Sequence, residues 1–303
     1  GLDELTAEEI TFLLDTARAF KGVGERSLKK VPALRGKTLV NFFVEPSTRT
    51  RTSFEVAAMR LSADVVNISA TASSLQKGET LKDTALNLQA LHADIIVLRH
   101  SSPGSSKFLA ERLDSSIINA GDGTHEHPTQ ALLDAFTMQE RIGSLEGKNI
   151  VIVGDILHSR VALSNIFGLQ KLGANVAVSG PSTLIPRAIH ELGVEVIPHV
   201  DDALAWADVA NVLRVQHERM DRAFFPSIRE YHNRYGITMD RLKRLEKIPL
   251  IMHPGPINRG VELTSEVADS PHAAILNQVE NGVAVRMAVL YLLAAQSTTT
   301  DVV

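Results

Sequence analysis

The feature that most constrains the fold is the alternation of short apolar runs with stretches of helical period. In the first half of the chain, runs of strand length occur at Thr38 to Phe43, Val65 to Ile68, Ile95 to Leu98 and Ile117 to Asn119. Helical stretches separate them at Thr52 to Leu61, Thr80 to Leu91 and Lys107 to Leu113. Apolar runs that alternate with helices are typical of parallel sheets covered by helices. The sequence therefore predicts an α/β fold whose first unit is a doubly wound parallel sheet.

A second series of the same kind follows a helix predicted from Thr129 to about Arg141. Its strands are expected at Asn149 to Val153, Val176 to Val178, Val194 to Ile197, Val209 to Leu213 and Leu250 to Met252. The last helix, Gln278 to Ala295, has no strand after it and could therefore pack back on the first unit. The charged segment from Arg241 to Lys247 is interpreted as a solvated helix face. We therefore expect two doubly wound parallel-sheet domains linked by helices.

Composition excludes several classes of function. The chain has 303 residues, a formal charge of −4 and no cysteine. It therefore has no broad basic field for nucleic acid, and no disulfide, thiolate metal site or cysteine nucleophile. The longest apolar stretch, Val283 to Ala295, is interrupted by Arg286, so no membrane span is expected. The first 20 residues lack the pattern of a signal peptide, so cytoplasm is the expected location.

One loop has the composition of a phosphate site. Ser47-Thr48-Arg49-Thr50-Arg51 lies between the strand that ends at Phe43 and the helix expected from Thr52. Such a loop offers backbone N–H groups at the positive end of a helix dipole, together with three hydroxyls and guanidinium donors. The planar fork of arginine can hold two phosphate oxygens at once. The alternative is a capping Ser/Thr cluster with solvated arginines.

Three further loops follow predicted strands and carry groups suited to a carbonyl, phosphate or carboxylate. They are Arg99-His100, His127-Pro128-Thr129-Gln130 and His253-Pro254-Gly255-Pro256. Each has a simpler interpretation, as a solvated arginine, a helix cap and a rigid turn respectively. In open α/β sheets, however, ligands bind beyond the carboxyl ends of the strands. The convergence of these loops therefore favours one anion-binding region.

Four motifs occur in order along the chain: Ser47-Thr48-Arg49-Thr50-Arg51, His127-Pro128-Thr129-Gln130, Arg214-Val215-Gln216 and His253-Pro254-Gly255-Pro256. Lys77-Gly78-Glu79-Thr80 and Val153-Gly154-Asp155 lie between them. Together they resemble the catalytic chain of the aspartate carbamoyltransferase family over nearly the whole sequence. This resemblance implies transfer of a carbamoyl group from carbamoyl phosphate to the amine of L-aspartate, the committed step of pyrimidine biosynthesis, without metal or cofactor.

The resemblance assigns the carbamoyl phosphate site residue by residue. The phosphate is expected at Ser47, Thr48, Arg49 and Thr50, with charge added by Arg99. Thr50 and His127 would donate hydrogen bonds to the carbonyl oxygen as it gains negative charge. Gln130 would hold the carbamoyl end, and the carbonyl groups of Gly255 and Pro256 would accept hydrogen bonds from the carbamoyl NH2.

The resemblance also assigns the aspartate site. Arg160, and Arg214 with Gln216, match the positions that bind aspartate, which gives one arginine for each carboxylate. The residues before Arg160 read His158-Ser159 and differ from those of other members. Lys77 and either Ser73 or Ser74 match a loop that reaches the active site of a neighbouring subunit. A homotrimer with shared active sites is therefore expected.

Several points stay open at this level. The resemblance implies a carbamoyl phosphate-binding domain of residues 1–134 plus 278–303 and an aspartate-binding domain of residues 135–277. A regulatory chain or a dihydroorotase is a possible partner. Ornithine carbamoyltransferase is the nearest alternative, although its turn contains a cysteine that this chain lacks. A third hypothesis is a non-catalytic homologue that acts as an assembly partner. A dinucleotide-binding oxidoreductase is disfavoured because no Gly-x-Gly-x-x-Gly follows Val153.

Overall fold

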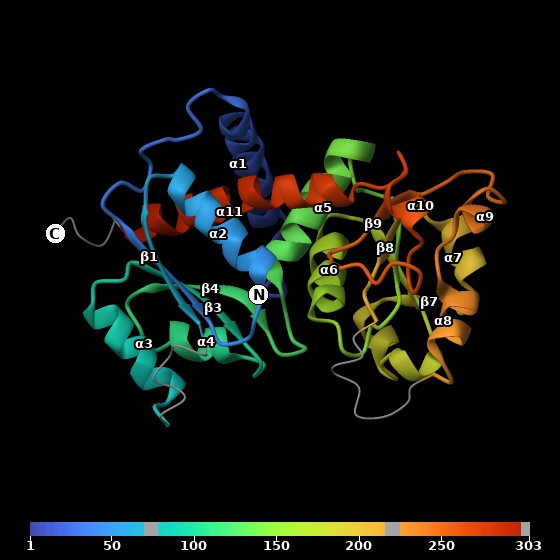
Figure 1. Cartoon of the computed structure of the whole chain (residues 1–303), viewed down its shortest axis with the longest axis horizontal. Coiled ribbons are helices and arrows are strands. Elements are labelled where there is room, and N and C mark those ends of the chain that lie inside the picture. The colour runs from blue at the N-terminus through green and yellow to red at the C-terminus, as the bar shows by residue number, and fades with distance from the viewer. Residues whose placement is uncertain (70–77, 216–224, 298–303) are drawn as a thin grey trace. The chain divides into compact units, whose positions relative to one another are not determined.

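The chain divides into two units, each built around one sheet (Figure 1). The computed structural model describes residues 1–69, 78–215 and 225–297. The first unit comprises Gly1, Glu8–Thr129 and Glu280–Val303, and the second comprises Leu2–Ala7 and Gln130–Val279. The strands of both sheets are parallel, so the predicted α/β class is confirmed.

The sheet of the first unit has four strands in the order β2-β1-β3-β4. The strands are β1 (Thr38–Phe43), β2 (Asp64–Ser69), β3 (Ile95–His100) and β4 (Ser116–Asp122). Successive side chains point to opposite faces of a strand. Leu39 and Phe43 therefore enter one core, whereas Val40 and Phe42 enter another. Because both faces are buried, the central strands appear in the sequence as continuous apolar runs.

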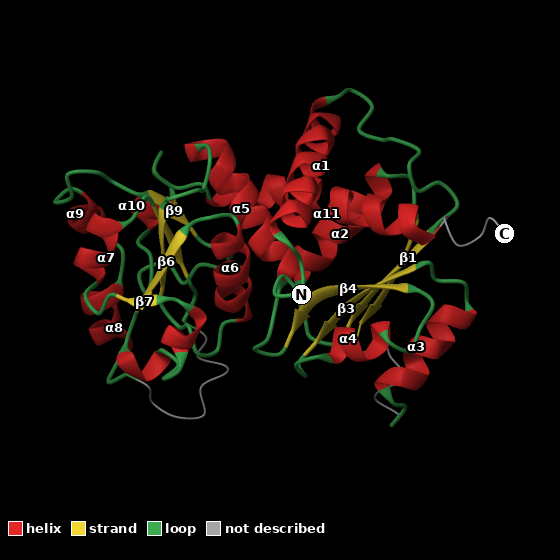
Figure 2. Cartoon of the chain, turned by 180° about the vertical axis from the view of Figure 1, so that it is seen from behind, coloured by secondary structure: helices red, strands yellow, loops and turns green. Residues whose placement is uncertain are grey.

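Helices cover both faces of this sheet (Figure 2). One face carries α1 (Ala7–Glu25), α2 (Thr48–Arg60) and the later part of α11 (Ile275–Ser297), and the other carries α3 (Leu81–Ala90) and α4 (Ser105–Ala110). Phe54 of α2 and Met287 of α11 are fully buried in the same core. The prediction that the last helix packs back on the first unit is therefore confirmed.

The sheet of the second unit has five strands in the order β7-β6-β5-β8-β9. They are β5 (Asn149–Val153), β6 (Asn175–Ser179), β7 (Glu195–Val196), β8 (Val209–Val212) and β9 (Leu250–Met252). β7 is exposed at one edge, which explains why it is shorter than the predicted run from Val194 to Ile197. The central strands β5 and β8 are almost fully buried and match their predicted ranges closely.

The second unit also contains most of the short helices. The helices are α5 (Pro128–Ile142), α6 (Arg160–Lys171), α7 (Val200–Trp206), α8 (Ile228–Tyr235), α9 (Met239–Leu242), α10 (Ser265–Ala268) and the 3-10 turns η3 (Ser182–Leu184) and η4 (Ile189–Leu192). Ser159 caps α6, because its side chain accepts a hydrogen bond from the N–H of Ala162. Val200 and Leu204 of α7 pack against Val151 and Val153 of β5. The helices thus bury one face of the second sheet.

Two predicted boundaries near the phosphate loop are wrong. α2 begins at Thr48, not near Thr52, so the Thr-Arg-Thr-Arg segment forms its first turn. β3 continues to His100, so Arg99 and His100 belong to the strand end instead of following it. Both errors have one cause. Polar side chains at the end of a helix or strand interrupt the apolar pattern, so a prediction from hydrophobicity makes the element too short.

The interpretation of Arg241 to Lys247 as a solvated helix face is also wrong in part. α9 ends at Leu242, and Arg241 is buried. Its Nη1 lies 2.7 Å from Oδ1 of Asp201, and its Nη2 donates to the carbonyl of Asn233 at 3.0 Å. Lys243 and Arg244 are exposed as expected. An arginine that pairs with a distant acid cannot be told from a solvated one by local sequence.

Gly180 lies at a close approach of two strand ends, which gives a first prediction. A Cβ at Gly180 would overlap the backbone oxygen of Gly154, the residue that follows β5. We expect Gly180→Ala to lower the free energy of unfolding by about 1–3 kcal/mol, measured by urea denaturation. Gly22→Ala, in α1 with open space around the position, is the control and should not destabilise the protein. Equal stability of both variants would contradict this account.

No helix in the described ranges 1–69, 78–215 and 225–297 has the length and apolar character needed to cross a membrane.

Candidate functional site

The first group of predicted site residues lies at the N-terminus of α2, directly after β1. Ser47 is the N-cap residue, and its side chain makes no capping hydrogen bond. The first backbone N–H groups of a helix have no intrahelical partner. Thr50 is buried in this turn, whereas Thr48 and Arg49 are exposed. The turn therefore combines N–H donors, hydroxyls, a guanidinium and the positive end of the helix dipole, which together suit a phosphate.

Arg99 lies beside this turn because β3 is the neighbour of β1. Its Nη2 is 3.0 Å from Oε1 of Glu45, and its Nη1 donates to the carbonyl of Ala120 at 3.0 Å. The N–H of Val44 donates to the carbonyl of Arg99 at 2.9 Å. The guanidinium is thus fixed next to the loop that leads to Ser47.

His100, the next residue of β3, has a different role from Arg99. Burial lowers the pKa of His100, and the nearby carboxylates of Glu45 and Asp122 oppose this effect. Its Nδ1 accepts a hydrogen bond from the N–H of Ser102 at 2.9 Å. The imidazole is therefore neutral near pH 7, and Arg99 supplies the positive charge at this strand end.

Asp122 shapes the loop that presents His127. Its carboxylate accepts hydrogen bonds from the N–H of Gly104 at 2.6 Å, the N–H of Glu126 at 3.1 Å and the side chain of Asn119 at 2.8 Å. His127 is buried and immediately precedes α5. Because β4 neighbours β3, this loop lies at the same edge of the sheet as Arg99. Asp122 was not among the predicted site residues.

In the second unit, the predicted aspartate-binding arginines follow adjacent strands. Arg160 is the first residue of α6, after β5, and Arg214 follows β8. Arg160 is 3% exposed and Arg214 is half-buried. The structure thus places both residues beyond the carboxyl ends of neighbouring strands of the second sheet, where ligands of open α/β sheets bind.

A buried histidine stabilises the turn after β9. Nδ1 of His253 accepts from the N–H of Gly255 at 2.8 Å, and its Nε2 lies 3.1 Å from Oε1 of Glu262. Gly255 has a positive φ of 70°, which favours glycine over other residues. In the hydrogen bonds of the described residues, the carbonyl oxygens of Gly255 and Pro256 accept none. The turn therefore offers two rigidly held acceptors.

Gln130 lies in the first turn of α5 and is almost buried, with 8% of its surface exposed. Its Nε2 donates to Oδ1 of Asp134 at 2.8 Å. Four predicted residues, Ser73, Ser74, Lys77 and Gln216, lie outside the described residues. The other predicted site residues all lie at strand ends or helix starts of their own unit.

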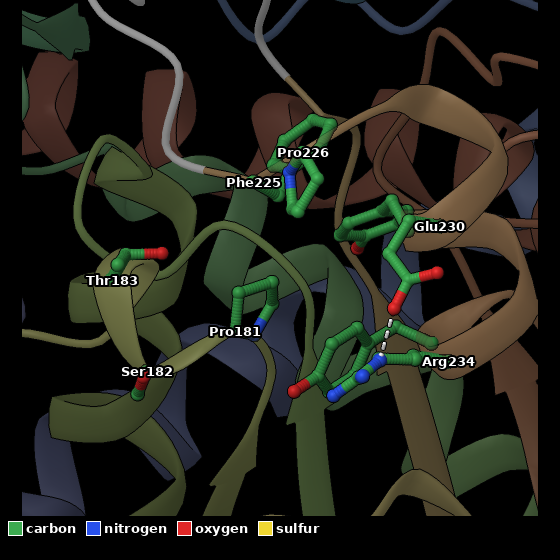
Figure 3. Close-up of a pocket in the computed structure, with 9 residues that line it drawn as sticks. Pro181, Ser182, Thr183, Phe225, Pro226, Glu230 and Arg234 are labelled. Carbon is green, nitrogen blue, oxygen red and sulfur yellow. Dashed lines mark hydrogen bonds and ion pairs between the residues drawn. The ribbon is translucent and has the colours of Figure 1, made fainter.

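A cavity of about 240 Å³ lies elsewhere in the second unit (Figure 3). It is formed by the turn at Pro181–Thr183, by Phe225 and by α8. Glu230 and Arg234 of α8 form an ion pair on its wall. None of the predicted site residues lines this cavity. Because its two charges neutralise each other, it lacks the net positive charge of the strand-end sites.

Two parallel α/β units with arginines, hydroxyls and helix N-termini at their strand ends define an enzyme that handles small anionic substrates. Comparison with known proteins gives the family. Residues 1–140 match the aspartate/ornithine carbamoyltransferase carbamoyl-P binding domain, and residues 146–293 match the Asp/Orn binding domain of the same family. The chain belongs to the aspartate/ornithine carbamoyltransferase family and is a carbamoyltransferase, which confirms the resemblance found in its motifs.

Relatives and solved structures agree with this assignment. The chain is 60% identical to the aspartate carbamoyltransferase catalytic subunit of Gemmatimonas aurantiaca over 97% of its length and 92% of that protein. It is 61% identical to the catalytic subunit of Cytophaga hutchinsonii, covering 97% and 96%. Aspartate transcarbamoylase from Trypanosoma cruzi, solved with N-(phosphonacetyl)-L-aspartic acid, has a TM-score of 0.87 at 31% identity, covering 96% and 94%. Ornithine carbamoyltransferase from Pyrococcus furiosus reaches 0.84 at 32% identity, with the same coverage.

Proposed function

We propose that the chain transfers the carbamoyl group of carbamoyl phosphate to the amine of L-aspartate. The products are N-carbamoyl-L-aspartate and phosphate, and the reaction is the committed step of de novo pyrimidine biosynthesis. One observation carries the proposal. The anion-binding groups of each unit lie at the carboxyl ends of neighbouring parallel strands, with a phosphate-type helix start in one unit and two arginines in the other.

The residues divide the chemistry as follows. Ser47, Thr48 and Arg49 bind the phosphate, and Arg99 stabilises its charge as it leaves. Thr50 and His127 donate to the carbonyl oxygen, where negative charge grows as the amine attacks. One such donor typically lowers the activation barrier by about 2.7–4 kcal/mol. The amine nitrogen forms a bond to the carbamoyl carbon, the carbon–oxygen bond to phosphate breaks, and the phosphate takes the amine proton.

Aspartate is preferred over ornithine as the second substrate. Aspartate has two carboxylates, and Arg160 and Arg214 provide one guanidinium fork for each. Ornithine would bring a cationic side chain to the same arginines, at a cost in repulsion. The fold does not separate the two activities, because solved structures of both enzymes resemble the chain. The relatives near 60% identity are aspartate enzymes, which favours aspartate.

We further propose a cytoplasmic homotrimer in which Lys77 reaches the site of a neighbouring subunit. Among the residues that the structure describes, β2 pairs with β1 alone and lies at the sheet edge. Val66 on this strand and Met59 near the end of α2 are about half exposed, at 47% and 48%. An exposed strand edge with apolar side chains fits a subunit contact. Residues 1–134 plus 278–303 are proposed as the carbamoyl phosphate-binding domain and 135–277 as the aspartate-binding domain.

The test is an assay of the purified chain with carbamoyl phosphate and either L-aspartate or L-ornithine. We expect N-carbamoyl-L-aspartate and no citrulline, the ornithine product, from a species that sediments as a trimer. Citrulline as the main product would reverse the substrate assignment. An active monomer would exclude the shared site, whereas an inactive, well-folded trimer would exclude catalysis by this chain alone.

A further inference from the structure

Asp134 is a fully buried carboxylate of α5 that is surrounded by amides. Oδ1 accepts from Nε2 of Gln130 and from Nε2 of Gln278, both at 2.8 Å. Oδ2 accepts from Nδ2 of Asn165 at 2.9 Å and from Nδ2 of Asn211 at 3.2 Å. Among the described residues, no lysine or arginine pairs with it. Four neutral donors therefore replace the cation that a buried acid usually has.

Burying a carboxylate without a cationic partner costs free energy. Its effect on the structure is to orient the four amides around it. Burial raises the pKa of Asp134, and the four amide hydrogen bonds oppose that rise. An ionised carboxylate can only accept hydrogen bonds. Each of the four amides must therefore turn its NH2 toward Asp134 and its oxygen elsewhere. The carboxylate thus sets the direction of every amide around it, which an apolar side chain could not do.

Gln130 shows the consequence most directly. It lies one helical turn before Asp134, at the i, i+4 spacing that brings side chains together. Since its NH2 is bound to Oδ1, its Oε1 is the atom left for another partner, and this oxygen accepts no hydrogen bond from the described residues. The NH2 of a carbamoyl group is a donor that needs such an acceptor.

The same carboxylate oxygen also supports the turn after β9. Gln278 donates to Oδ1 of Asp134, and its Oε1 accepts from the backbone N–H of His253 at 2.9 Å. His253 in turn accepts from the N–H of Gly255. A continuous chain of hydrogen bonds therefore runs from Asp134 through Gln278 and His253 to the N–H of Gly255, in the turn whose carbonyl groups are proposed to receive the carbamoyl NH2.

We propose that Asp134 is a positioning residue that makes the site select an NH2 group over a methyl group on the acyl carbon of the substrate. Oδ1 orients the two sets of acceptors, Gln130 and the Gly255–Pro256 turn. Oδ2 is anchored by Asn165 of α6 and Asn211 of β8, which fixes the carboxylate itself. This inference rests on the proposed function, since it concerns the carbamoyl end of carbamoyl phosphate.

The test measures recognition of the NH2 group separately from overall binding. Two stable probes are used, phosphonoacetamide and 2-oxopropylphosphonate, which differ only in an NH2 or a CH3 on the carbonyl. Calorimetry on the full chain in its native assembly should show that the unaltered protein binds the amide probe more tightly. Asp134→Leu removes both acceptor oxygens while keeping a similar branched side-chain shape, so the NH2 of Gln130 is no longer held. We expect the preference for the amide probe to fall about tenfold.

Asn211→Ala is the matched control. It removes one hydrogen bond from Oδ2 without touching Gln130 or Gln278, so it should lower thermal stability and keep the preference. If Asp134→Leu does not fold, Gln278→Met removes the hydrogen bonds of Gln278 to Asp134 and to His253 but leaves Gln130 bonded to Oδ1. It should reduce the preference about threefold.

The outcomes separate the two proposals. An unaltered protein that binds neither probe would overturn the proposed function. A protein that binds both equally, or an unchanged preference in Asp134→Leu or Gln278→Met, would overturn the role of Asp134 and leave the proposed function intact. An equal loss of preference in Asn211→Ala would also overturn it, because the effect would then follow from stability alone.

Discussion

Arg99→Leu should lower kcat/KM for carbamoyl transfer by about 10²–10³-fold, mainly through kcat. Arg99 is held by Glu45 and by the carbonyl of Ala120, beside the helix start proposed to bind the phosphate. The charge on the leaving phosphate grows as its bond to the carbamoyl carbon breaks, so a fixed guanidinium contributes most in the transition state. Steady-state kinetics with carbamoyl phosphate varied at saturating aspartate measure the effect.

Glu45 provides the control, because removing Arg99 also removes an ion pair from this half-buried acid. Glu45→Gln keeps the guanidinium and should cost less than about tenfold. The double variant Arg99→Leu, Glu45→Gln should remain as slow as Arg99→Leu. If the double variant recovered most of the activity, the defect would come from the stranded carboxylate, and the proposed role of Arg99 would be wrong.

The sequence predicted the sheets well because their central strands are buried on both faces. β5 and β8 are almost fully buried, and such strands stand out as uninterrupted apolar runs. The starts of functional elements were predicted less well. Thr48 begins α2, and the first turn from Thr48 to Arg51 contains only threonine and arginine, so no apolar residue marks it.

The residues that support the site are harder to predict than those proposed to bind the substrates. Asp134 contacts partners that are distant in sequence, such as Gln278, and Asp122 contacts Gly104 as well as the nearby Asn119 and Glu126. The spacing of Gln130 and Asp134 is a local signal, since side chains four residues apart on a helix are neighbours. Tertiary hydrogen bonds of this kind leave no periodic trace in a sequence.

The second large effect is expected for aspartate binding. Arg214→Leu should raise KM for L-aspartate by about 100-fold and leave the binding of carbamoyl phosphate nearly unchanged. Arg214 follows β8 at the carboxyl edge of the second sheet and is half-buried, so a carboxylate there is partly desolvated and depends on its guanidinium partner. Kinetics at varied aspartate and calorimetry with phosphonoacetamide measure the two effects separately.

Two further variants decide whether geometry or charge is responsible. Arg187→Ala removes one positive charge from an exposed position of the same unit and should change KM for aspartate less than about twofold, because exposed charges are screened by solvent and salt. Arg214→Lys keeps the charge but loses the planar fork, so it should recover only part of the affinity. If Arg187→Ala had the larger effect, or if Arg214→Lys bound aspartate normally, Arg214 would act through the general field of the unit. Only a guanidinium that binds one carboxylate through two N–H groups predicts that KM for aspartate rises in the order Arg187→Ala, Arg214→Lys, Arg214→Leu.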